Sequence, residues 1–180
     1  MGKKDNLVQY FWQITYAHTI AYFIAGLLSK IFMNYDELWA TEIMSSFYRP
    51  IDAPIISLAI FLQMPRGILI ALFILPLRKA FFVENRGLLK LGLIVLGFSA
   101  ISTIGAVCSS YEGYIFLKLP LEIHLIGYPE ILFYISLFVG ILYVSQKFVH
   151  KKIIIISSIT LMIFIGFFGI MGYLAAKGII

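Results

Sequence analysis

Residues 53–77 read APIISLAIFLQMPRGILIALFILPL, and this apolar stretch decides the class of the protein. It is longer than the about 20 residues that an α-helix needs to cross the hydrocarbon core of a bilayer. The tripeptide Pro65-Arg66-Gly67 interrupts it. Because proline removes one backbone hydrogen bond inside a helix, we predict one kinked span. The alternative is a re-entrant segment over 54–64 followed by a short helix over 67–77.

The composition of the whole chain indicates a lipid environment. Of its 180 residues 61% are hydrophobic and 13% are charged, and the mean hydropathy is +0.96. A soluble domain averages about 45–50% apolar and about 25% charged residues. These values exclude a soluble single-core domain, a disordered chain and a fibre. We expect one membrane domain over 1–180, with the lipid bilayer as a partner and no nucleic-acid partner.

Four further apolar stretches predict spans, and the expected fold is therefore an all-α polytopic helix bundle with about five transmembrane helices. The five spans are 8–33, 53–77, 88–107, 131–148 and 153–176. The first is retained rather than cleaved as a signal peptide, because it runs long and carries Gln13 and His18. Apolar residues recur at helical spacing within 34–52, which predicts a short amphipathic helix on the outer surface.

The distribution of charge predicts the orientation, with the N-terminus inside and the C-terminus outside. Nine cations then lie inside: Lys3, Lys4, Arg78, Lys79, Arg86, Lys90, Lys147, Lys151 and Lys152. Four lie outside: Lys30, Arg49, Lys118 and Lys177. Seven of the nine carboxylates also fall outside, so binding or chemistry is expected on the outer face. The expected location is the plasma membrane, as a multi-pass protein.

Arg66 is the strongest functional signal in the chain. It lies about midway along the span over 53–77, near the centre of the bilayer. A central arginine costs about 2.5–3.5 kcal/mol on insertion scales, so it requires a partner, water or a ligand. Two interpretations have equal weight: a ligand-binding residue facing a polar cavity, and an internal staple between helices.

Three other residues join Arg66 as candidate ligand-binding positions. His18 lies mid-membrane, and the favoured interpretation is a neutral imidazole bonded to a neighbouring hydroxyl of Thr15, Thr19 or Tyr22. Glu130 follows a proline at the head of a span, where a helix dipole favours a carboxylate; a bond to Arg66 or Arg49 is the alternative. Arg49 itself lies in the first outer connection.

The outer connections also carry candidate catalytic groups, namely Asp52, Glu112, Glu122 and His124. Glu122 and His124 are two residues apart, which places them on one face of an extended segment. Such a pair suits divalent-ion binding or acid–base chemistry, but no metalloprotease or serine-hydrolase motif accompanies it. The favoured interpretation is that these charges solvate the loops and pair with Arg49 and Lys118. We expect no bound metal and no cofactor.

Gly166, Gly169 and Gly172 repeat every third residue in the last span. Small residues on one helix face permit close helix packing in membranes. The stripe serves either the bundle itself or a homo-oligomer contact.

Six short motifs lie along the middle of the chain. The first three are Arg49-Pro50-Ile51-Asp52-Ala53-Pro54, Pro65-Arg66-Gly67 and Pro76-Leu77-Arg78, and the later ones are Glu112-Gly113, Pro120-Leu121-Glu122-Ile123-His124 and Pro129-Glu130. Together, over about 47–145, they resemble a family of small uncharacterised bacterial polytopic membrane proteins. The resemblance implies a bacterial inner-membrane protein and attaches no function to it.

Three functions are compatible with these features, and whether the protein is an enzyme is open. The first is binding or transport of a small anionic or lipid-like ligand through a cavity containing Arg66, in an oligomer because five spans are few for a carrier. The second is an outer-leaflet enzyme that uses the Glu/His/Asp cluster. The third is a structural or accessory membrane subunit. We favour the first, because a midplane charge beside a helix break is the more specific signal.

Overall fold

The fold is described from a computed structural model that defines residues 6–103, 105–148 and 152–180. Within these ranges it is helical throughout, without strands. The α-helices are α1 (Leu7–Phe32), α2 (Tyr35–Ala40), α3 (Glu42–Phe47), α4 (Pro54–Ile74), α5 (Arg78–Phe82), α6 (Gly87–Leu96), α7 (Tyr111–Phe116), α8 (Leu121–Ile126), α9 (Tyr128–Lys147) and α10 (Lys152–Ala176). A 3-10 turn, Leu75–Leu77, follows α4 and a π-helical turn, Gly97–Ile101, follows α6. The predicted inside cations Lys3, Lys4 and Lys151 lie outside the described residues.

Among the described residues, three helical segments are long and apolar enough to cross a membrane: Pro54–Phe82, Leu121–Lys147 and Lys152–Ala176. They expose large apolar side chains, including Phe73, Ile163 and Phe167. Such surfaces are unfavourable in water, whereas lipid tails are equally apolar. The structure therefore defines an all-helical protein with helices of membrane length.

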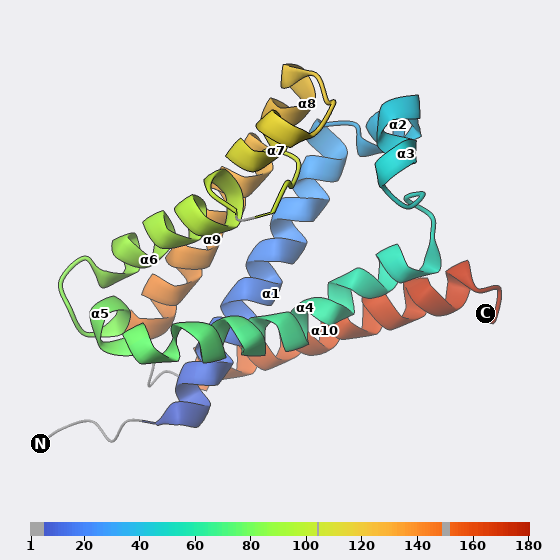
Figure 1. Cartoon of the computed structure of the whole chain (residues 1–180). Helices are drawn as coiled ribbons and strands as arrows, with labels where there is room; N and C mark the ends of the chain where they lie inside the picture. The colour runs from blue at the N-terminus through green and yellow to red at the C-terminus, as the bar shows by residue number, and fades with distance from the viewer. Residues whose placement is uncertain (1–5, 104, 149–151) are drawn as a thin grey trace, which may run out of the picture.

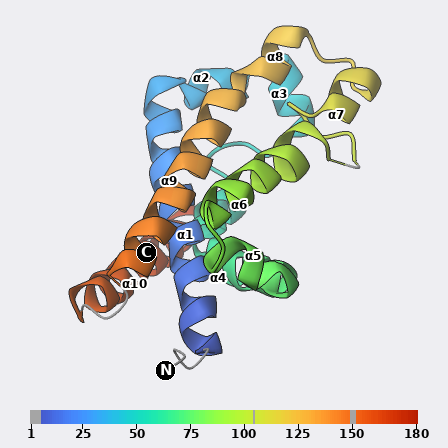
Figure 2. The same ribbon diagram turned by 90° about the vertical axis from the view of Figure 1, so that its left-hand side faces the viewer.

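The long helices alternate in direction. Helix α1 packs antiparallel to α4. The Tyr10 hydroxyl, near the start of α1, donates to the Ala71 carbonyl at 2.9 Å, near the end of α4, whereas His18, further along α1, contacts Gln63, which comes earlier in α4. In Figure 1, α4 and α10 run side by side across the picture, and α1 and α9 rise steeply past them. Figure 2 shows α9 crossing in front of α1, and the side chains of Ile14, Ala17 and Ala21 of α1 are fully buried. The core therefore lies around α1.

A single helix, α4, runs through Pro65, so the break into a re-entrant segment and a short helix does not occur. It approaches α1 closely next to Arg66. A Cβ placed on Gly67 would lie 2.8 Å from the Thr15 Cα. Only glycine permits this backbone approach, and the crossing brings the polar residues of α4 to the face of α1.

The glycine stripe of α10 is used inside the chain. Gly166 and Gly169 lie against Phe61 of α4, and Gly172 lies against Ser57. Of the two interpretations, bundle packing is therefore the one found: this face of α10 is occupied by α4.

Two segments differ from their predicted bounds. The span expected over 88–107 is helical only to Ile101, because Ser102 leaves helical geometry and Thr103 instead bonds the Gly105 carbonyl. The amphipathic segment forms two short helices, α2 and α3. Thr41 separates them, since its backbone is extended and its hydroxyl accepts from the Met44 N–H of α3.

Candidate functional site

Four polar side chains from three helices meet inside the bundle. His18 comes from α1, Gln63 and Arg66 from α4, and Tyr134 from α9. The His18 Nδ1 lies 2.6 Å from the Tyr134 hydroxyl, and its Nε2 lies 3.1 Å from the Gln63 Oε1. Arg66 Nη1 donates to the same Gln63 oxygen at 3.4 Å. We call these four residues the central network.

Within the central network, hydrogen bonds link Tyr134 to His18, His18 to Gln63, and Gln63 to the backbone of Ala59. The Gln63 Nε2 donates to the Ala59 carbonyl at 3.0 Å, which fixes its Oε1 as the atom facing His18. A carbonyl oxygen only accepts, so His18 carries its proton on Nε2. In the neutral imidazole its Nδ1 then accepts from the Tyr134 hydroxyl. The expected bond from His18 to Thr15, Thr19 or Tyr22 is wrong, because helices α4 and α9 supply better-placed partners.

Arg66 is exposed at the surface of the bundle although it belongs to the central network. A guanidinium has five N–H donors, and the described residues supply one hydrogen bond, the long one to Gln63. The charge lies near enough to His18, Tyr22 and Tyr134 to interact electrostatically with each. Most of its donor capacity therefore has no hydrogen-bond partner among the described residues.

A second feature is a cavity of about 530 Å³ at the opposite end of α1 from the N-terminus. We call it the outer cavity; α1, α2, α3, α4, α8 and α9 all contribute to its wall. Glu130, in the first turn of α9, lines it and accepts a hydrogen bond from the Tyr35 hydroxyl. Burial and this bond to the carboxylate raise the pKa of Tyr35, so the phenol keeps its proton. Glu130 thus has the predicted helix-terminal position, and its described hydrogen-bond partner is Tyr35 rather than Arg66 or Arg49.

The candidate catalytic residues are not assembled into one site. Residues 121–126 form helix α8, so the extended segment expected to align Glu122 with His124 is wrong. Glu122 is exposed, whereas His124 is buried and its Nδ1 accepts from the Ser109 N–H at 3.3 Å. Glu112 lies in the first turn of a different helix, α7.

The remaining outer charges, Asp52 and Arg49, are both exposed in the connection between α3 and α4. Among the described residues, no group of three or more His, Cys, Asp or Glu side chains is placed to hold a metal ion. The outer acids therefore occupy separate positions rather than a shared centre.

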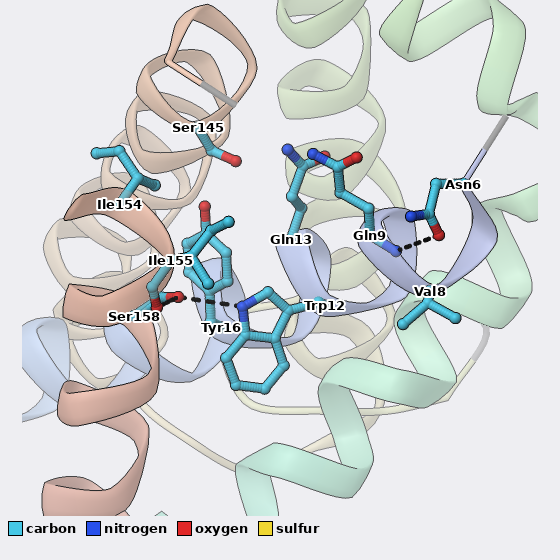
Figure 3. A pocket seen from close by; sticks show the side chains of 10 residues that line it. All are labelled: Asn6, Val8, Gln9, Trp12, Gln13, Tyr16, Ser145, Ile154, Ile155 and Ser158. Carbon is cyan, nitrogen blue, oxygen red and sulfur yellow. Dashed lines mark hydrogen bonds between the residues drawn. The ribbon is translucent and has the colours of Figure 1, made fainter. Parts of the chain in front are cut away.

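A third feature is a cavity of about 400 Å³ beside the N-terminal half of α1, shown in Figure 3. Its polar lining is neutral and comes from Asn6, Gln9, Gln13, Tyr16, Ser145 and Ser158. The Trp12 indole N–H donates to the Ser158 hydroxyl at 3.1 Å and ties α1 to α10. The polar side chains of α1 thus line this inner cavity, enter the central network and reach the outer cavity at Tyr22.

Sequence reasoning missed Gln63 and Tyr134 of the central network. Gln63 had a usable signal, since it is an amide in an apolar stretch three residues before Arg66, on the same helix face. Tyr134 had none, because a single tyrosine in an apolar stretch is also an ordinary interfacial or packing residue.

The helices and the central network, in which His18 and Gln63 are buried, define the class: an all-helical protein of membrane type with polar groups in its interior. No family model, curated protein or solved structure matches the chain, so the predicted membership of a bacterial family stays a prediction.

Proposed function

We propose that the protein crosses the plasma membrane five times and binds or transports a small anionic or lipid-like ligand at Arg66. The observation that carries the proposal is the unused donor capacity of Arg66. Its guanidinium is exposed at the middle of α4 and has one described hydrogen bond. In hydrocarbon the remaining N–H groups require oxygen partners. A phosphate or carboxylate supplies such partners in bidentate geometry.

Two further helices complete the five proposed spans. The α1 has 26 residues, about 39 Å at 1.5 Å per residue, which is enough to cross the about 30 Å hydrocarbon core. Its polar residues Thr15, His18 and Thr19 are buried against neighbouring helices, so they do not meet lipid. The other is α6 with its π-helical turn, 87–101, the third proposed crossing in chain order, which is short and therefore requires a locally thinned bilayer.

Oligomerisation is part of the same proposal, because five spans are few for a carrier. The glycine stripe is not the contact, since α4 covers it. Exposed apolar faces of α4, α6 and α10 remain for a second copy or for lipid.

The test compares anion binding by Arg66→Ala with binding by Arg86→Ala, a control at an exposed arginine outside the network. Native mass spectrometry of the detergent-purified protein measures retained phosphatidylglycerol, with phosphatidylcholine as the zwitterionic reference. Equilibrium dialysis with radiolabelled inorganic phosphate measures a small anion instead. We expect the Arg66 substitution to weaken one of these by about tenfold or more, and the control to leave both unchanged.

The staple interpretation predicts a different result. If Arg66 only joins helices, Arg66→Ala lowers the thermal stability and binding stays at the wild-type level in the folded fraction. Should Arg66→Ala fail to fold, Arg66→Gln keeps an N–H donor for Gln63 and removes the charge. Wild-type binding by a folded Arg66→Gln protein contradicts the proposal.

A further inference from the structure

The outer cavity has a chemistry that the Arg66 proposal does not use. Its volume of about 530 Å³ lies within the about 300–1,000 Å³ of small-molecule sites. Arg66 does not line it. The charged side chains of its wall are one carboxylate, Glu130, and one ammonium, Lys30.

One wall of the cavity is a continuous row of aromatic rings. Tyr35 stacks on Trp39 with ring centroids 6.3 Å apart, and Trp39 meets Tyr48 at 5.3 Å. The row begins at the carboxylate, because the Tyr35 hydroxyl donates to Glu130 Oε2. Aromatic faces are electron-rich and attract ammonium groups, most strongly where water is excluded.

The Glu130 carboxylate has capacity for a ligand. Tyr35 occupies Oε2, and the described residues place no hydrogen bond on Oε1. The side chain is only partly exposed and lines an otherwise apolar cavity. A negative charge in such surroundings favours a cation beside it.

Lys30 does not supply that cation to Glu130. Its ammonium lies 3.5 Å from the Asp36 carboxylate, and the two side chains are 51% and 61% exposed. The pair therefore lies in solvent at the rim, where the two charges offset each other. The remaining wall, including Phe23, Leu27 and Ile60, is apolar and suits a hydrocarbon chain.

We propose that the outer cavity binds an amphipathic cation, with its ammonium group between the Glu130 carboxylate and the row of Tyr35, Trp39 and Tyr48. The apolar part of the ligand lies against α1 and α4. This site is separate from Arg66 and takes a ligand of opposite charge.

The chain offers a fluorescent reporter for this site. It has two tryptophans, Trp12 in the inner cavity and Trp39 in the aromatic row. In a Trp12→Phe protein, purified in a maltoside detergent, all tryptophan emission comes from Trp39. Titration with decyltrimethylammonium, below the concentration at which it forms micelles, is expected to change this emission saturably. A neutral decyl ethoxylate is expected to give no saturable change.

Glu130→Gln in the same background tests the charge. The glutamine carbonyl still accepts from the Tyr35 hydroxyl, so this hydrogen bond is retained while the charge is removed. We expect about tenfold or more weaker binding, which corresponds to about 1.4 kcal/mol per tenfold. Glu122→Gln, at an exposed carboxylate of α8, is the matched control and is expected to bind as before.

The single cysteine gives a second readout. Cys108 lines the cavity, so bound decyltrimethylammonium is expected to slow its alkylation by a maleimide.

Equal affinity of Glu130→Gln and the parent protein, or equal binding of the neutral ethoxylate, overturns the proposal. The anion assays at Arg66 use other ligands and another site, so failure of either proposal is seen independently.

Discussion

His18 shows how a polar residue is accommodated in the middle of an apolar bundle. Both ring nitrogens are used, one by Tyr134 of α9 and one by Gln63 of α4. The side chain is 1% exposed, so water cannot replace either partner. A buried polar group that loses its partner costs about 1–3 kcal/mol, which makes the complete network more stable than any part of it.

We therefore expect His18→Leu to lower the free energy of unfolding by about 1–3 kcal/mol, because it leaves the Tyr134 hydroxyl without its partner and the Gln63 Oε1 with only the long bond from Arg66. Tyr134→Phe leaves the buried His18 Nδ1 without its partner and is expected to cost about 1–3 kcal/mol for the same reason. The measurement is reversible unfolding in mixed micelles of maltoside and dodecyl sulfate, followed by circular dichroism. A leucine variant as stable as the parent protein would show that the bonds to His18 contribute nothing to folding.

Helix crossings decide which of these residues can meet. The α1 and α4 approach at Gly67, where a Cβ would lie 2.8 Å from the Thr15 Cα and 3.1 Å from its carbonyl oxygen. Backbone atoms cannot move aside as a flexible side chain can. The glycine next to Arg66 therefore sets the distance over which His18 and Gln63 interact.

Gly67→Ala is expected to force α1 and α4 apart and to cost about 1–3 kcal/mol of stability, as overpacked cores do. Gly140→Ala in α9 is the matched control, because nothing lies within 4 Å of the added Cβ. Alanine is favoured over glycine inside a helix by about 0.5–1 kcal/mol, so the control is expected to be as stable as the parent or more stable. Thermal unfolding of both variants in one detergent measures the difference, and equal stabilities would contradict the close crossing.

At the scale of the whole molecule, the third of the five proposed crossings is the shortest. The α6 segment with its π-helical turn ends at Ile101. If this segment does not cross, Lys79 before it and Cys108 after it lie on one side of the membrane. If it crosses, they lie on opposite sides.

We expect a membrane-impermeant maleimide to label Cys108 in intact cells, because the proposed N-inside orientation places the cavity that Cys108 lines on the outer side. In a Cys108→Ser protein, Lys79→Cys at an exposed position of α5 is expected to react only after the membrane is permeabilised. Labelling of both positions from the same side would exclude the five-span arrangement. Cys108→Ser without a second change is the background control.

The amino-acid sequence alone determined that this protein is of membrane type and where its long helices lie. Apolar length and composition are local properties, so the helical segments around 8–33, 53–77, 131–148 and 153–176 were predicted to within a few residues. The end of the third segment was missed, because Ser102 and Thr103 leave the helix through local hydrogen bonds that hydropathy does not encode.

Only the tertiary structure decided which residues meet. Tyr134 is 116 positions from His18, and Tyr35 is 95 positions from Glu130. Such contacts depend on helix crossings, set by glycine at Gly67 and in α10, and not on spacing along the chain. The same geometry separated Glu122 from His124 and assembled the aromatic row beside Glu130, since side-chain direction follows from the helix on which each residue lies.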